Sequence, residues 1–205
     1  MLESIIENKI VAVIRGASEE SILSIAERLL KGGVKTLEIT VETPRVNNLI
    51  EKLVTTFGNQ LIVGAGTVLD PETARSAIQA GAKFIFSPTV NIETIKMTKR
   101  YGVISIPGAL TPTEILTAYE NGADIVKVFP ANVFGPGYLK SVNAPLPQIP
   151  LMPTGGIELS NIKEYLNAGA VAVGIGNSLV NTQKLSNPNF FEELEGKAKA
   201  FVAAL

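Results

Sequence analysis

The sequence predicts an α/β fold of the (β/α)8 barrel type, with residues 1–205 forming a single domain that begins with a short helix at residues 2–8. Three observations predict this fold. Short apolar runs alternate eight times with helical segments, glycines repeatedly separate a helix from the next strand, and no linker rich in proline or serine interrupts the chain. Dividing 205 residues among eight units leaves about 26 residues each, near the lower limit for such barrels.

The expected strands are short runs rich in Val, Ile, Leu and Phe, as is typical of parallel strands covered on both faces. These runs occupy residues 10–14, 35–40, 61–63, 83–86, 103–106, 125–129, 149–152 and 171–173. The expected helices open at capping residues or prolines, and most of them end at glycines. These helices occupy residues 18–30, 43–58, 70–81, 91–101, 111–122, a short segment from 135, 159–168 and 188–204.

A doubly wound open sheet is the alternative to the barrel. That fold carries a glycine-rich fingerprint after its first strand, and no such fingerprint follows residues 10–14 here. Gly64-Ala-Gly-Thr-Val68 matches only the first half of the fingerprint, because the third glycine is missing. The eight units therefore favour the barrel.

The composition excludes several classes of function. The chain has no cysteine and no histidine, so disulfides, a cysteine nucleophile and a histidine-based triad are excluded, and Glu, Asp, Lys or Tyr must move protons. A net charge of -1 gives no sign of a nucleic-acid partner. No apolar run approaches the length of a membrane span, and the N-terminus lacks a signal-peptide pattern. We therefore expect a soluble cytoplasmic protein with no membrane association.

Lys127 stands in the middle of the apolar run at 125–129. Burial of an ammonium group is costly, so this lysine is expected to be paired, unusually neutral, or both. A neutral amine is a nucleophile towards carbonyl carbon. The alternative is a lysine whose stem packs in the core while its charged head reaches solvent at the strand end.

Polar residues gather at the carboxyl ends of the expected strands, which is where barrel enzymes place their chemistry. Glu38 and Lys127 are the two ionisable residues at the centres of apolar runs, and their strands lie opposite each other in a closed barrel. A carboxylate opposite an amine could relay protons while the amine holds a carbonyl substrate as an imine. The polar residues of this set are Arg15, Glu38, Thr40, Thr67, Ser87, Lys127, Thr154 and Ser178.

Glycines follow the last two expected strands, as Gly155-Gly156 and as Gly174-Ile-Gly-Asn-Ser178. Barrels often bind phosphate in these two loops through backbone N–H groups, which glycine allows the anion to approach closely. Ordinary turn glycines are the alternative explanation. The occurrence of such glycines in both loops favours a phosphate site.

The sequence resembles the family of 2-keto-3-deoxy-6-phosphogluconate (KDPG) and 4-hydroxy-2-oxoglutarate (KHG) aldolases. The matching motifs follow one another in family order and extend over residues 10–180, nearly the whole chain. They are Val13-Ile-Arg-Gly16, Leu37-Glu-Ile-Thr40, Gly64-Ala-Gly-Thr-Val68, Phe86-Ser-Pro88, Pro107-Gly108, Thr111-Pro-Thr-Glu114, Lys127-Val-Phe-Pro130, Gly135-Pro-Gly-Tyr-Leu-Lys140, Pro153-Thr-Gly-Gly156 and Gly174-Ile-Gly-Asn-Ser178.

The resemblance implies a (β/α)8 barrel, a homotrimer, and an imine-forming aldolase that needs no metal or other cofactor and acts on a phosphorylated keto sugar acid. It implies that Lys127 forms the imine and that Glu38 transfers protons. The residues that it implies for substrate binding are Arg15, Thr67, Pro88, Thr154, Gly155, Gly156 and Ser178, with Thr67 near the pyruvyl carboxylate and Gly155, Gly156 and Ser178 at the phosphate.

One position departs from the family pattern. Members that use the phosphogluconate substrate carry an arginine four residues after the catalytic glutamate, where this sequence has Glu42. The nearest cation, Arg45, comes three residues later. The catalytic step does not need that arginine, so the reaction type stands. The substrate alternatives are the phosphogalactonate epimer and unphosphorylated 4-hydroxy-2-oxoglutarate.

Two other classes of function compete with the aldolase. One is a different phosphate-handling barrel enzyme, an isomerase or synthase, in which Lys127 only pairs with phosphate. The other is a non-catalytic protein that binds a sugar phosphate in the same pocket.

Overall fold

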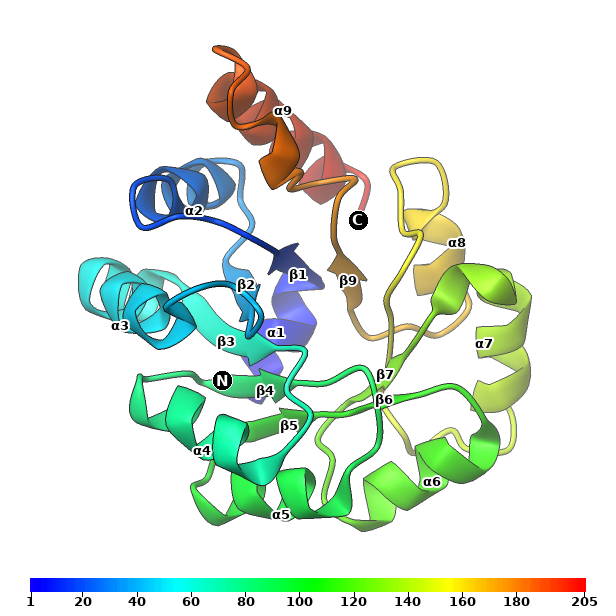
Figure 1. Cartoon of the computed structure of the whole chain (residues 1–205). Helices are drawn as coiled ribbons and strands as arrows, with labels where there is room; N and C mark the ends of the chain where they lie inside the picture. Colours follow the sequence, from blue (N-terminus) through cyan, green and yellow to red (C-terminus); the bar gives the residue numbers. More distant parts are fainter.

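The computed structural model describes all 205 residues and shows parallel strands surrounded by helices (Figure 1). The strands are β1 (Ile10–Ile14), β2 (Thr36–Thr40), β3 (Ile62–Gly66), β4 (Phe84–Phe86), β5 (Ile104–Ile106), β6 (Gly108–Ala109), β7 (Val126–Val128), β8 (Leu151–Pro153) and β9 (Val173–Ile175). The α-helices are α1 (Leu2–Asn8), α2 (Ile22–Lys31), α3 (Val46–Phe57), α4 (Pro71–Gln79), α5 (Ile92–Arg100), α6 (Pro112–Glu120), α7 (Gly135–Asn143), α8 (Ile162–Asn167) and α9 (Phe190–Ala203). Short 3₁₀ helices lie at η1 (Gly58–Gln60), η2 (Ala131–Val133) and η3 (Thr182–Lys184).

All strand pairs are parallel, which confirms the α/β class. The strands form a six-stranded sheet in the order β5-β4-β3-β2-β1-β9 and a three-stranded sheet in the order β6-β7-β8. The eight-stranded ladder predicted from the sequence is therefore not continuous.

Prolines mark both interruptions of the ladder. Pro107 separates β5, which pairs with β4, from β6, which pairs with β7. Pro153 lies in β8, and only the isolated bridges Leu151–Ala170 and Thr154–Gly174 connect the segment that contains β8 with the segment that contains β9. Proline has no N–H to donate, so it weakens the pairing of any strand that contains it.

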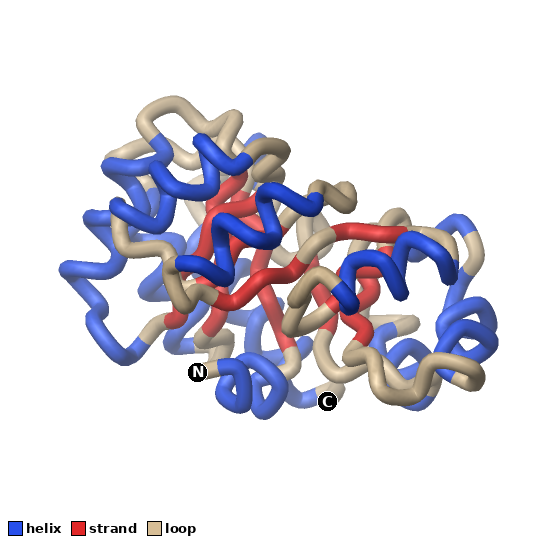
Figure 2. The backbone as a smooth tube through the Cα atoms, turned by 90° about the horizontal axis from the view of Figure 1, so that it is seen from below, coloured by secondary structure: helices blue, strands red, loops and turns tan.

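Two layers of apolar side chains hold the fold together. The larger layer lies between the strands and the ring of helices that surrounds them (Figure 1). The view at right angles shows helices on both sides of the strands (Figure 2). The smaller layer lies among the strands and takes residues from both sheets, including Phe84 and Phe86 of β4 and Met152 of β8. Ile5 of α1 belongs to this inner layer, so the predicted N-terminal helix is present and packs against the inside of the strand assembly. The two sheets share one interior.

Helix capping largely follows the sequence prediction. The Asp70 carboxylate accepts a hydrogen bond from the N–H of Thr73 at 2.7 Å, and Pro71 begins the helix. Thr111 and Glu114 form a reciprocal capping box at the start of α6. The second helix begins later than predicted, at Ile22, because residues 18–21 form a turn closed by serine hydroxyls.

Strand boundaries differ more. The last two strands begin two residues later than predicted, at Leu151–Pro153 and Val173–Ile175. Their apolar runs continue from connectors that are also buried, so hydrophobicity alone does not mark where pairing begins. None of the helices is long and apolar enough to cross a membrane.

Candidate functional site

A cavity of about 570 Å³ opens at the carboxyl ends of the strands. All nine residues that the family resemblance implies for catalysis or substrate binding line this cavity: Arg15, Glu38, Thr67, Pro88, Lys127, Thr154, Gly155, Gly156 and Ser178. Thr40 and Ser87 are buried beside it but do not line it. The cavity wall also contains residues that the sequence analysis did not select: Val13, Phe129, Ile157, Glu158, Gly176 and Asn177.

Glu38 lies at the centre of β2, where it is registered with Val13 of β1 and Gly64 of β3. Only 1% of its surface is exposed, and its Oε2 has no hydrogen-bond partner in the protein. A buried oxygen without a partner is costly, and such groups recur at functional sites. The carboxyl group is therefore available to a substrate or a water in the cavity.

Gly66 of β3 makes room for that carboxyl group. A Cβ atom at position 66 would lie 1.5 Å from Oε2 of Glu38, which is far shorter than any allowed non-bonded contact. The φ angle of Gly66 is not in the left-handed region, so space, and not backbone conformation, requires glycine there. The other glycine of the motif, Gly64, makes room for the ring of Phe84, so packing explains both glycines of the half-matched fingerprint.

Lys127 occupies the centre of β7, the middle strand of the smaller sheet. It is 6% exposed, and its Nζ lies 4.1 Å from the ring centroid of Phe86 and 4.6 Å from that of Phe129. Aromatic faces attract an ammonium ion but accept no proton from it. Because Lys127 is buried and its Nζ lies between two aromatic rings, the alternative in which its charged head reaches open solvent does not describe it. Lys127 also forms no ion pair with any carboxylate.

Burial shifts both ionisable groups towards their neutral forms. Desolvation raises the pKa of Glu38 from 4.5 to about 8, and the cation of Lys127 opposes part of that shift. Desolvation likewise lowers the pKa of Lys127 from 10.5 to about 8, against the opposing effect of Glu38. An amine and a carboxyl group that both titrate near neutrality can exchange protons with a substrate placed between them.

Thr67 and Pro88 lie on the β3 and β4 side of the cavity. Thr67 has φ 59, in the left-handed region that β-branched residues rarely adopt. Strain of this kind concentrates at functional sites. Pro88 follows Ser87, whose hydroxyl donates a 2.6 Å hydrogen bond to the carbonyl of Val68 and so fixes the loop after β4 to the loop after β3.

The opposite side of the cavity consists of the loops after β8 and β9. Thr154 is 6% exposed, and its Oγ1 has no hydrogen-bond partner. The Ser178 hydroxyl donates to the carbonyl of Ile157 at 2.6 Å and ties the two loops together. The backbone N–H groups of Gly156, Asn177 and Ser178 donate no hydrogen bond within the chain. Free N–H groups in two adjoining loops can bind an oxyanion.

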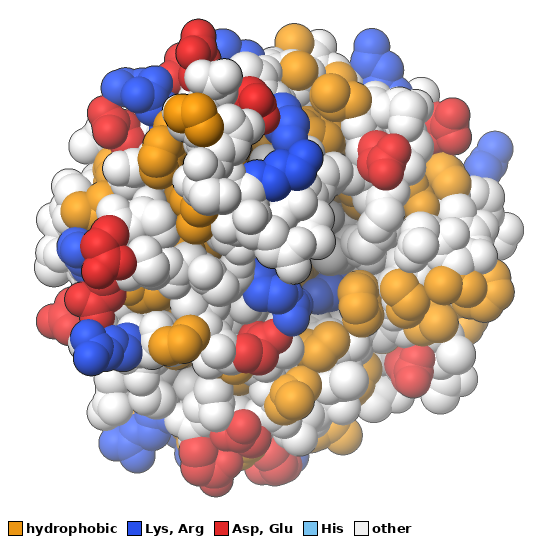
Figure 3. Space-filling model, turned by 45° about the horizontal axis from the view of Figure 1, so that its top comes forward, with side chains coloured by type: hydrophobic (Ala, Val, Ile, Leu, Met, Phe, Trp, Pro, Cys, Tyr) orange, Lys and Arg blue, Asp and Glu red, His pale blue; other side chains and the backbone are white.

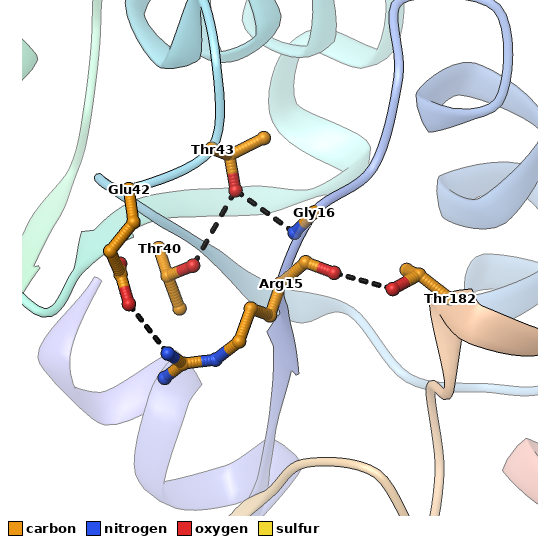
Figure 4. Close-up of polar contacts among 6 residues, drawn as sticks. All are labelled: Arg15, Gly16, Thr40, Glu42, Thr43 and Thr182. Carbon is orange, nitrogen blue, oxygen red and sulfur yellow. Dashed lines mark hydrogen bonds and ion pairs between the residues drawn. The ribbon is translucent and has the colours of Figure 1, made fainter.

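Arg15 and Glu42 form an ion pair at the rim, shown in Figure 4. Nη1 of Arg15 lies 2.5 Å from Oε1 of Glu42, and both side chains are largely exposed. The space-filling view likewise shows basic and acidic side chains side by side near the middle of the face that carries the hollow (Figure 3). Glu42 therefore contacts the pocket through Arg15, and Arg45 pairs elsewhere, with Glu19 at 3.0 Å.

Phe129 is the principal residue that the sequence analysis missed. It stacks near Lys127, lines the cavity, and also lines a second depression of about 660 Å³ between the loops after β4 and β6. Its position two residues after Lys127 in Lys127-Val-Phe-Pro130 was the available signal, since alternate residues of a strand share a face. No group of three or more Asp, Glu, His or Cys side chains is placed to hold a metal ion.

A family model described as KDPG and KHG aldolase matches residues 2–194. The chain belongs to this family. The aldolases of the family are carbon–carbon lyases, as the names of the relatives indicate.

Two curated relatives and one solved structure illustrate the similarity. A 2-dehydro-3-deoxy-6-phosphogalactonate aldolase of Escherichia coli (strain K12) is 32% identical over 95% of this chain and 93% of its own length. A 2-dehydro-3-deoxy-phosphogluconate aldolase of Pseudomonas aeruginosa is 39% identical over 78% of this chain and 73% of its own. The structure of a KDPG aldolase from Legionella pneumophila, with pyruvate captured as a covalent carbinolamine intermediate, superposes with a TM-score of 0.90, 30% identity and 98% coverage of both chains.

Proposed function

We propose that this protein is a class I, imine-forming aldolase that reversibly cleaves 2-keto-3-deoxy-6-phosphogluconate to pyruvate and glyceraldehyde 3-phosphate. The observation that carries the proposal is the environment of Lys127, the only lysine in the cavity wall, whose burial lowers its pKa to about 8. At pH 7 a pKa of 8 leaves about a tenth of the amine unprotonated, several hundred times more than an ordinary lysine. A free amine is what attack on a ketone requires.

In the cleavage direction, Nζ of Lys127 adds to the C2 carbonyl to give a carbinolamine, which loses water to form a protonated imine. Glu38, through a water, removes the proton of the C4 hydroxyl. The C3–C4 bond breaks and the aldehyde leaves. The electron pair of that bond forms the C2–C3 double bond, and the protonated imine becomes a neutral enamine. Glu38 returns a proton to C3, and hydrolysis of the imine releases pyruvate and restores the lysine.

The proton transfers of this cycle are consistent with the shifted pKa values of Glu38 and Lys127. Glu38 and Lys127 form no direct ion pair, and both line the same cavity, where a substrate and a water can lie between them. Once the protonated imine forms, its nitrogen carries a positive charge at the position of the Lys127 ammonium. That cation lowers the pKa of Glu38 and favours its ionised form at the step that needs a base.

The substrate runs across the cavity between two sets of groups. Thr67 and Pro88 contact the pyruvyl portion, and Gly155, Gly156 and Ser178 bind the distal phosphate. Arg15 and Thr154 also contact the substrate. Free N–H groups at Gly156, Asn177 and Ser178 support this orientation. Phosphate bound there would position the reacting carbons as well as hold the ligand, so its loss should lower kcat/KM.

The phosphogalactonate epimer and 4-hydroxy-2-oxoglutarate are the alternative substrates. The Pseudomonas aeruginosa relative supports the phosphogluconate substrate, and the Escherichia coli relative supports the galactonate epimer. Glu42, in place of the family arginine, supports neither. Lys127 and Glu38 keep the same roles with all three substrates.

Parallel cleavage assays test the proposal. The purified protein is given each of the three substrates and the dephosphorylated analogue of the first, and pyruvate release is followed with lactate dehydrogenase. We expect pyruvate from the phosphorylated gluconate, with kcat/KM at least about tenfold above that of the dephosphorylated analogue. Higher efficiency on another substrate would reassign the substrate. No pyruvate from any of them would favour a non-aldolase phosphate-binding barrel or a non-catalytic binding protein.

We also infer a single closed (β/α)8 domain that assembles as a cytoplasmic homotrimer. The inner apolar layer shared by the two sheets supports the closed barrel. Exposed Val133 and Phe134, beside Phe129 at the cavity, support burial against another subunit. Light scattering coupled to size-exclusion chromatography measures the oligomeric state, and a monomer would contradict the inference.

A further inference from the structure

Arg15 is the only solvent-accessible cation in the wall of the cavity. The other cation there is Lys127, which is buried and acts as the nucleophile of the proposed reaction. The Arg15 side chain is 62% exposed and that of Glu42 is 45% exposed. Glu42 neutralises Arg15, so the cavity wall presents no unpaired, solvent-accessible cation to an anionic substrate.

The backbone that carries this ion pair is held firmly on both sides, as Figure 4 shows. The Thr182 hydroxyl donates a 2.6 Å hydrogen bond to the carbonyl of Arg15. Gly16 N–H donates to Oγ1 of Thr43 at 3.1 Å, which connects the end of β1 to the turn that follows β2. The fixed backbone leaves rotation of the two side chains as the way to separate the pair.

Each partner has only the other. Arg15 pairs with no other carboxylate, and Glu42 pairs with no other cation. Exposed ion pairs are weak because water solvates both charges well when they part. An oxyanion that offers Arg15 a better-placed partner can therefore displace Glu42 at small cost.

We propose that Glu42 is a specificity-determining residue that acts as a displaceable counter-ion: a substrate oxyanion takes its place on Arg15. This inference rests on the proposed aldolase function and deepens it. The oxyanion is either the carboxylate of the pyruvyl portion or the phosphate of the aldehyde portion. Both are possible because Arg15 follows β1, which lies between the two ends of the pocket: β2 and β3 are on one side of it and β9 is on the other. Competition with Glu42 raises KM for the substrate that carries that group.

The test is Glu42→Gln, assayed in the condensation direction with pyruvate and glyceraldehyde 3-phosphate varied in turn. We expect KM to fall about two- to fivefold for one of the two, with kcat changed less than twofold, as loss of one exposed competing charge predicts. A fall for pyruvate assigns the carboxylate to Arg15, and a fall for the aldehyde assigns the phosphate. The difference between variant and wild type should shrink at high ionic strength.

Two comparisons make the test specific. In an Arg15→Met background, Glu42→Gln should leave both KM values unchanged, because the residue through which Glu42 acts is gone. Glu19→Gln, which breaks the similar exposed pair of Arg45 with Glu19 outside the cavity, should leave the wild-type KM values unchanged. The inference would be overturned if wild type and Glu42→Gln had equal KM values. It would also be overturned if Glu42→Gln lowered KM equally in the Arg15→Met background, or if Glu19→Gln lowered KM to the same extent.

Borohydride trapping of pyruvate separates this failure from failure of the proposed function. If the wild type forms an adduct on Lys127 but Glu42→Gln does not change either KM, only the role of Glu42 is wrong. If the wild type forms no adduct, the proposed aldolase mechanism is wrong, and the inference falls with it.

Discussion

Two pairs, each of one acidic and one basic residue, lie in or beside the pocket and differ in burial and in contact. Lys127 and Glu38 are buried, form no ion pair, and have pKa values displaced towards neutrality. Arg15 and Glu42 are exposed and in direct contact at 2.5 Å. Arg15 and Glu42 neutralise each other's charge through their contact. Lys127 and Glu38 have no such contact, and burial shifts their pKa values into the range where both can exchange protons. In the proposed mechanism, burial without an ion pair is what keeps the amine and the carboxyl group available for proton transfer.

The largest expected effect follows from removing the buried amine. Lys127→Ala should abolish turnover, because no other lysine lines the cavity. Lys127→Arg should fail equally, since a guanidinium stays protonated and cannot attack a carbonyl. Steady-state assays with circular dichroism as a folding control measure this. Near-native turnover by either variant would show that the reaction does not pass through an imine at this position.

Removal of the buried carboxyl group should be the next largest effect. Glu38→Gln keeps the shape of the side chain but cannot carry the proton, so turnover should fall by about 10²- to 10⁴-fold, the usual contribution of a positioned acid–base group. Pyruvate should still be trapped on Lys127, although more slowly. Unchanged turnover would assign the proton transfer to another group.

Loss of the space around the carboxyl group should have a smaller effect. Gly66→Ala places a Cβ 1.5 Å from Oε2 of Glu38, so the carboxyl group must move, and we expect about a 10- to 100-fold loss of turnover with lowered stability. Gly196→Ala in α9 is the matched control, because a Cβ there meets nothing within 4 Å.

A double variant identifies the cause of that loss. Gly66→Ala should cost little stability in a Glu38→Ala background, where the clashing side chain is absent. An equal loss of stability in both backgrounds would mean that residues other than Glu38 impose the requirement for glycine.

The smallest expected effect is on stability. Since burial raises the pKa of Glu38 from 4.5 to about 8, the folded protein keeps a proton that the unfolded chain releases. Its contribution to stability is therefore present below pH 4.5 and is lost as the pH rises towards 8. Glu38→Gln has no such loss, so its unfolding free energy should gain about 1–3 kcal/mol relative to wild type between pH 5 and pH 8. Urea unfolding at several pH values measures this, and a constant difference would contradict the shifted pKa.

The sequence predicted the α/β class and the order of elements because the signals involved are local. The Asp70 cap and the capping box of Thr111 with Glu114 act within one helical turn, and the apolar runs report burial directly. The break in the strand ladder at Pro107 was not predicted. It depends on which neighbour each half of the segment pairs with, and that is a property of the assembled sheets.

The same distinction applies to the site. The sequence could select Lys127 and Glu38 because a charge inside an apolar run is unusual wherever it occurs. It could not show that Gly66 exists to accommodate Glu38, or that Glu42 contacts Arg15, since both relations join different strands. Phe129 was overlooked because an aromatic residue in a strand is ordinarily assigned to the core.

Trapping of pyruvate with borohydride across a pH series tests the central claim most directly. Reduction converts the imine into a stable secondary amine, which peptide mass spectrometry locates, and the trapping rate follows the fraction of free amine. The account predicts one adduct, on Lys127, with a trapping rate that rises with pH and has a midpoint near 8. No adduct, an adduct on another lysine, or a midpoint near the ordinary value of 10.5 would contradict it.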